Sequence, residues 1–131
     1  MLYSIDSHCY IKTLPHKSDF DRWRKNISDA DYDKVVDTLL ADFFQTGEIA
    51  VSSFIPGKDW SGTPYQAIWH ACSKNDRQAA LFFGLIVFKT LMDMPFADGV
   101  WSLGKAKNYT DKFENIRGIL YFKLTNPPPV S

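Results

Sequence analysis

The sequence is poor in cysteine, in glutamate and in net charge. Its only cysteines among 131 residues are Cys9 and Cys72, with no Cys-x-x-Cys pair, which excludes a disulfide scaffold and removes any need for an oxidising compartment. Fifteen basic and fifteen acidic side chains cancel, which excludes a polybasic tail and a strongly acidic chain. Seven glycines and seven prolines exclude a collagen-like chain.

Long apolar runs are also missing. The longest, Ala79 to Phe88, has ten residues and as a helix spans about 15 Å, half of a hydrocarbon core of about 30 Å. The first residues carry no basic stretch, and Asp6 and His8 interrupt any apolar core of a signal peptide. We therefore expect a cytoplasmic protein that does not contact a membrane.

Aromatic residues, in contrast, are abundant. Ten Phe, six Tyr and four Trp make up 15% of the chain, within a hydrophobic content of 45%. A chain of this length can bury roughly two-thirds of its unfolded surface and is the size of one ordinary domain. Residues 1–131 are therefore predicted to form a single α+β domain, with a proline-rich tail over residues 126–131.

Hydrophobic periodicity predicts four helices. The clearest runs from Tyr32 to Phe44, with apolar residues at i, i+3, i+4 and i+7, after Ser28 as its N-cap. A shorter helix is predicted after Ser18, and another from Thr63-Pro64 to about Ser73. The last, from Asp76 to Met92, is apolar nearly all round, which is typical of a helix at the centre of a domain.

The remaining segments are predicted to be strands. They are a short edge strand within Leu2–Ile11, then Glu48–Ile55, Val100–Leu103 and Ile119–Leu124. The expected fold is a single compact α+β domain, four helices around a buried central helix with a small antiparallel sheet. After the first short helix, the element order is similar to that of a winged-helix domain: helix, strand, two helices, then a two-stranded wing.

One candidate binding site is the loop that joins the second predicted strand to the third helix. Lys58, Asp59, Trp60, Ser61 and Thr63 offer a positive charge, hydroxyl donors and a ring next to a helix N-terminus, where anions are attracted. The order is not that of a P-loop, whose lysine follows the second glycine. The loop is either a small-anion or nucleotide site or an ordinary connection with Trp60 on the core.

A second candidate site is a nucleic-acid surface. In the winged-helix analogy the Asp76–Met92 helix would contact bases through residues at its start, Arg77 and Gln78. A basic loop with interleaved aromatics would contact backbone through Lys105, Lys107, Lys112 and Arg117. The zero net charge favours instead a solvated hairpin loop, because phosphate contacts supply most non-specific affinity.

No metal, cofactor or catalytic set is predicted. His70 and Cys72 are two positions apart on a predicted helix and so diverge by about 200°. Many of the thirteen aspartates lie at helix starts, where the helix dipole accounts for them. The favoured hypothesis is a non-catalytic binding or accessory protein that acts through protein–protein contact, with a partner protein or a second copy of itself.

Overall fold

The structure is a computed structural model of all 131 residues, described here over residues 1–5, 7–46, 49–51, 62–105, 119–124 and 126–129. It is an α+β fold. In chain order its elements are β1 (Leu2–Ser4), β2 (Cys9–Tyr10), α1 (Lys17–Arg24), α2 (Asp29–Thr46), β3 (Ile49–Val51), α3 (Gln66–Ala71), α4 (Asp76–Asp93), a 3-10 turn (Phe96–Asp98), β4 (Trp101–Lys105) and β5 (Ile119–Lys123).

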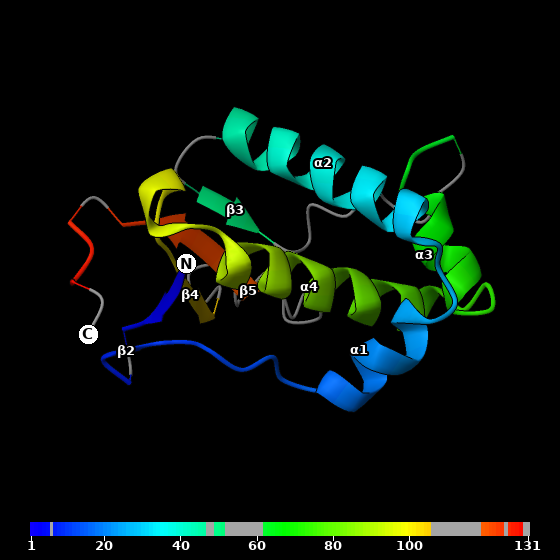
Figure 1. Cartoon of the computed structure of the whole chain (residues 1–131), viewed down its shortest axis with the longest axis horizontal. Helices are drawn as coiled ribbons and strands as arrows, with labels where there is room; N and C mark the ends of the chain where they lie inside the picture. The colour runs from blue at the N-terminus through cyan, green and yellow to red at the C-terminus, as the bar shows by residue number, and fades with distance from the viewer. Residues whose placement is uncertain (6, 47–48, 52–61, 106–118, 125, 130–131) are drawn as a thin grey trace, which may run out of the picture.

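The helix α4 lies at the centre of the fold, as the sequence predicts. It runs between α2 and α1, with the strands β4 and β5 behind it and α3 at its start (Figure 1). Phe82, Ile86 and Leu91 are fully buried along it. Burying each such side chain contributes roughly 1.5–3 kcal/mol relative to leaving it exposed, so α4 organises the core.

Aromatic rings fill the space between α1, α2 and α4. The rings of Phe20 and Trp23, both on α1, lie 5.7 Å from that of Phe82. The Arg24 guanidinium lies 4.2 Å from the Tyr32 ring and so joins α1 to α2. Much of the aromatic excess of the sequence is therefore core packing.

Helix starts follow the prediction at α2 but not at α1 or α3. The Ser28 hydroxyl accepts a hydrogen bond from the Asp31 backbone N at 3.1 Å, which confirms that cap. Helix α1 begins at Lys17 and so already includes Ser18. The residue before the helix, His16, has a left-handed backbone with φ 51°. Helix α3 begins at Gln66, because Gln66 N bonds the Thr63 carbonyl in a tighter turn that takes up the predicted first helical turn.

The sheet is mixed, so the prediction of an antiparallel sheet is wrong. Its strand order is β2-β1-β4-β5-β3, and β1 pairs parallel to β4 while the other pairs are antiparallel. The predicted single edge strand folds back at His8, which has φ 53°, into a hairpin. The first half of the predicted strand, β1, lies beside β4 inside the sheet. The second half, β2, forms one edge of the sheet.

The other strand predictions are confirmed where the structure describes them. β4 and β5 pair as a hairpin, and β3 begins at Ile49. Residues 48 and 52–55 of the predicted strand lie outside the described residues. None of the helices in the described ranges has the length and apolar character needed to cross a membrane.

Candidate interaction surface on the central helix

The candidate interaction surface is one side of α4, and the start of that helix is set by a local cap. The Asn75 side-chain oxygen accepts a hydrogen bond from the Gln78 backbone N at 3.0 Å, and Asp76 adds a carboxylate to the first turn. The core side of the helix is made by residues at most 2% exposed: Ala79, Phe82, Phe83, Ile86, Val87 and Leu91.

The opposite side carries what we call the α4 stripe: Leu81, Leu85 and Met92. They recur at i, i+4 and i+11, which brings them to one side of the helix. Leu81 is 55% exposed, and the other two are half-buried against the core. Phe88, on the same side between Leu85 and Met92, is buried. Gly84 adjoins Leu85, and a Cβ built there meets nothing within 4 Å. The exposed apolar surface of this side is therefore concentrated at Leu81, beside Gly84 and Leu85.

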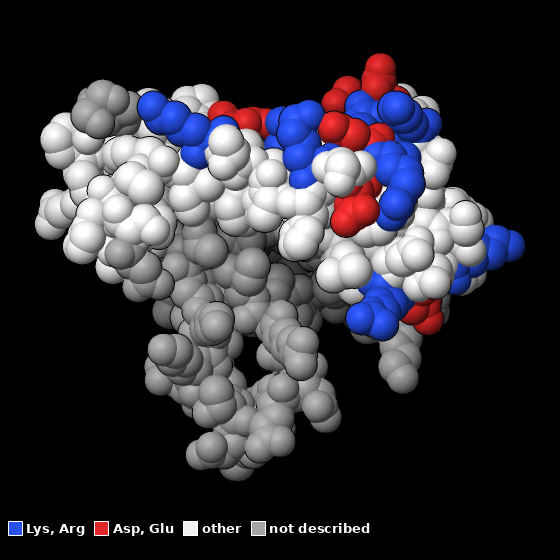
Figure 2. Space-filling view, turned by 90° about the horizontal axis from the view of Figure 1, so that it is seen from below, with Lys and Arg blue, Asp and Glu red and all other residues white. Residues whose placement is uncertain are grey.

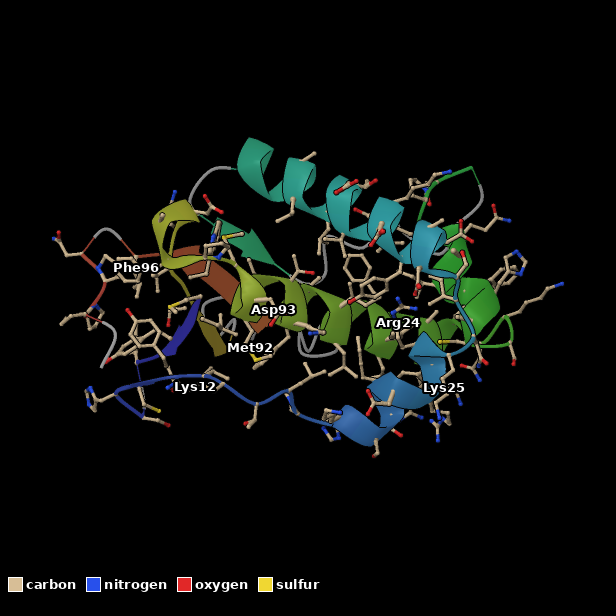
Figure 3. The ribbon with its side chains drawn as sticks, in the orientation of Figure 1. Lys12, Arg24, Lys25, Met92, Asp93 and Phe96 are labelled. Atoms are coloured by element: carbon tan, nitrogen blue, oxygen red, sulfur yellow. The ribbon has the colours of Figure 1, made fainter. Side chains whose placement is uncertain are left out.

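Charged side chains lie near both ends of the stripe. Lys74 and Arg77 are exposed near the start of α4, and within the described residues Arg77 makes no ion pair. Near the other end, Lys89 pairs with Asp93 at 2.6 Å. Figure 3 shows Met92 and Asp93 toward this second end, away from α1. Among the residues that the structure describes, the start of α4 is thus the end with a cation that forms no ion pair.

On the face of the molecule that Figure 2 draws, the charge of the described residues is mixed. Figure 2, seen from below, shows Lys and Arg side chains next to Asp and Glu side chains along the top and right of this face. On α1 these include the pairs Lys17–Asp21 at 2.8 Å and Arg22–Asp19 at 3.2 Å. Exposed pairs of this kind contribute about 0–1 kcal/mol to stability, and they produce no broad field of one sign.

The nucleic-acid prediction is only partly covered by the structure. Arg77 and Gln78 are exposed on the first turn of α4, as that interpretation requires. Lys105 ends β4, where its backbone pairs with Ile119. The Lys105 side chain and all of Lys107, Lys112 and Arg117 lie outside the described residues. The surface these four residues would form therefore stays a prediction.

The anion-loop prediction falls mostly outside the described chain. Lys58, Asp59, Trp60 and Ser61 are not described, and Thr63 is half-buried before α3. The Thr63 carbonyl accepts the hydrogen bond from Gln66 N at 3.1 Å, so its backbone serves the turn. A ligand at this loop remains a prediction.

The described histidines and cysteines do not gather into a cluster of the kind that binds a metal ion. Within the described ranges, no three His, Cys, Asp or Glu side chains are placed to hold a metal ion. His70, at the end of α3, is exposed and lies with its ring Nε2 3.4 Å from the Gln66 amide nitrogen. Cys72 is 2% exposed, and burial raises its pKa from 9.0 to about 11. A protonated, covered thiol is not a nucleophile.

The sequence predicts that Arg77 and Gln78 lie on the first turn of α4, where the structure has them, but their role stays a prediction, and the sequence does not indicate the α4 stripe. Ten consecutive apolar residues give no periodic contrast, so nothing in the run distinguishes Leu81 from Phe82. Comparison with known proteins does not add to this: no family model, curated protein or solved structure matches the chain.

Proposed function

We propose that this protein is a non-catalytic binding or accessory domain that contacts another protein through the α4 stripe. One observation carries the proposal: Leu81 is 55% exposed on a helix whose other large apolar side chains are buried or half-buried. An isolated exposed leucine is ordinary on a protein surface. Here, however, the half-buried Leu85 adjoins Leu81 on the same side of the helix, and a partner that covers Leu81 would also cover the exposed part of Leu85.

Gly84 supports the same proposal. A glycine inside a helix costs about 1 kcal/mol of helix propensity relative to alanine, and nothing in the described fold occupies the space its missing side chain leaves. A flat site beside Leu81 and Leu85 lets the backbone of a partner approach closely. The arrangement therefore fits contact with another protein along α4.

The test is position-specific photo-cross-linking combined with light scattering. A photoreactive residue at position 81 should capture one defined protein, either a second copy of this chain or a different one. The same residue at position 34, exposed on α2, is the control and should capture nothing at comparable yield. Light scattering then identifies self-association as a mass above that of one chain.

A substitution that places a charge at position 81 tests whether the association depends on Leu81. Leu81→Lys should abolish the association while changing the free energy of unfolding by no more than about 0.5 kcal/mol, because the side chain is exposed. A chain that stays monomeric and shows equal cross-linking at positions 81 and 34 contradicts the proposal. So does a Leu81→Lys variant that associates normally.

A second candidate function is nucleic-acid binding by a winged-helix-like domain. It is favoured by the element order, by the four-residue connection Cys72–Asn75 between α3 and α4, and by the exposed Arg77 and Gln78 where recognition helices contact bases. It ranks second because the next side chain of α4 able to hydrogen-bond after Gln78 is Lys89, eleven residues further on.

Salt dependence separates this second candidate from the first. Under it, the chain should bind a labelled DNA duplex at low salt, lose affinity steeply as salt rises, and bind more weakly after Arg77→Glu. Lys34→Glu is the matched control because Lys34 is an exposed cation on another helix. A duplex that does not change fluorescence anisotropy at low salt removes this candidate.

A further inference from the structure

The segment Asn126–Pro129, which we call the proline segment, is held against the opposite end of the sheet from β3. Three consecutive prolines fix the backbone near φ −65° and remove three N–H donors, so the segment favours an extended polyproline II conformation. Pro127 and Pro128 are half-buried, and Asn126 and Pro129 are exposed. A contact with the body of the protein accounts for the partial burial.

The segment lies well away from the strand that precedes it in the chain. That strand, β5, lies three positions from β2 in the sheet, a distance of about 14 Å at roughly 4.8 Å per strand. Leu124 is still tied to β4 through its backbone N, which bonds the Val100 carbonyl at 2.8 Å. A contact between the segment and β2 therefore joins the end of the chain to the far edge of the sheet.

The segment contacts Tyr10 on β2, whose ring lies next to that of Tyr3 on β1. Tyr3 and Tyr10 are paired across the hairpin, and their ring centroids are 5.0 Å apart in an edge-on arrangement. The Tyr10 hydroxyl donates a hydrogen bond to the Pro128 carbonyl. Burial and the neighbouring Tyr3 raise the pKa of Tyr10, which keeps this hydroxyl a donor.

A tyrosine hydroxyl bonded to a proline carbonyl, next to a second aromatic ring, is one feature of the aromatic-lined grooves that recognise proline-rich peptides. In such grooves ring faces receive the proline rings, and a polar group at the ring edge bonds a proline carbonyl that has no partner in the peptide itself. The surroundings also fit an uncharged ligand. Figure 2 shows mostly uncharged side chains at the left end, the end where Figure 1 places β2 and the last residues of the chain.

We propose that the Tyr3–Tyr10 surface is a binding site for proline-rich segments, occupied in cis by the proline segment, which a proline-rich segment of a partner protein displaces. The cis occupant benefits from an effective concentration in the millimolar range, so a partner must bind tightly or carry several prolines to compete. This site lies at the end of the molecule opposite to the start of α4, and it does not depend on the function proposed for the α4 stripe (Figure 1).

The test is an NMR titration of the full chain with the synthetic peptide Leu-Thr-Asn-Pro-Pro-Pro-Val, blocked at both ends. In one variant, Pro127, Pro128 and Pro129 are all changed to Gly, which frees the site while leaving the chain full length. This variant should bind the peptide at least tenfold more tightly than the unchanged chain, with shifts at Tyr3 and Tyr10. A peptide with serines in place of the prolines should not bind.

Tyr10→Phe, added to the glycine variant, removes the hydroxyl alone and should weaken peptide binding about fivefold, the loss expected for one hydrogen bond. Tyr32→Phe is the matched control: it changes a tyrosine on α2 and should leave the affinity unchanged. If circular dichroism shows that the triple variant is unfolded, the single Pro128→Gly variant replaces it.

Three outcomes overturn the proposal. If the glycine variant does not bind the peptide at several millimolar, the contact between Tyr10 and the proline segment is intramolecular only, and the surface does not bind other proline-rich segments. Equal binding of the serine peptide means that prolines are not recognised. Unchanged affinity after Tyr10→Phe places any binding elsewhere on the protein.

Discussion

The two cysteines show how strongly position in the fold changes the chemistry of one residue type. Cys9 is exposed on the edge strand β2, and Cys72 is buried where α3 ends. Burial is the larger influence on Cys72 and raises its pKa from 9.0 to about 11, while the nearby Arg22 charge acts weakly in the other direction. The Cys72 thiol therefore contributes to core packing and is not a reactive group.

Cys72 should make stability depend on alkaline pH. Its folded-state pKa lies above the unfolded value, so its contribution is complete below pH 9 and is lost as the pH rises toward 11. Two units correspond to at most about 3 kcal/mol. We expect the free energy of unfolding, measured by denaturant titration, to fall more steeply between pH 8.5 and 10.5 in the unchanged chain than in Cys72→Ala. Parallel slopes would show that the thiol is not responsible.

At the scale of elements, the glycines in and after α4 have different roles. Gly84 lies within the helix, and a Cβ there would meet open space. Gly99 directly follows the 3-10 turn Phe96–Asp98 and has φ 123°. A Cβ at this position would lie 2.9 Å from a side-chain carbon of Lys123. The first glycine is replaceable in the isolated chain, whereas the second is required by the backbone turn that leads into β4.

Substitution by alanine should separate these two roles. Gly84→Ala should raise the free energy of unfolding by roughly 0.5–1 kcal/mol, because alanine has the higher helix propensity and the site is open. Gly99→Ala, its counterpart, should lower it, because alanine does not readily adopt a positive φ. Thermal unfolding followed by circular dichroism measures both changes. A stabilising Gly99→Ala, or a destabilising Gly84→Ala, would contradict this account of α4.

At the scale of the whole molecule, the parallel pairing of β1 with β4 joins the first residues of the chain to the last hairpin. Leu2 pairs with Trp101, and both are buried. Ser102, which is fully buried, donates its hydroxyl to the Tyr3 carbonyl at 2.7 Å across 99 residues of sequence. This pairing also holds Tyr3 and Tyr10 beside the proline segment.

Removing the Ser102 hydroxyl should weaken the pairing of β1 with β4. Ser102→Ala leaves a buried acceptor short of one hydrogen bond and should cost about 1–2 kcal/mol of stability. Hydrogen exchange should speed up at the amides of β1 and β2 more than at those of α4. Ser18→Ala, an exposed serine on α1, serves as the reference and should shift stability by no more than about 0.5 kcal/mol. Uniform acceleration across the molecule would mean that β1 does not open on its own.

The order of the elements from α1 onward and the cap at Ser28 are determined by the sequence itself, because periodicity and capping depend on residues a few positions apart. The central position of α4 is also determined by the sequence, because a helix that is apolar nearly all round has to be covered on most sides. The place of β1 beside β4 was decided only by tertiary structure, since it joins segments about 100 residues apart that carry no mutual signal. Tertiary structure also decided which side of α4 carries the α4 stripe. The run is apolar throughout, so its two sides differ only because neighbouring elements cover one side more than the other. The contact between Tyr10 and Pro128 likewise exists only because folding brings the two ends of the chain together.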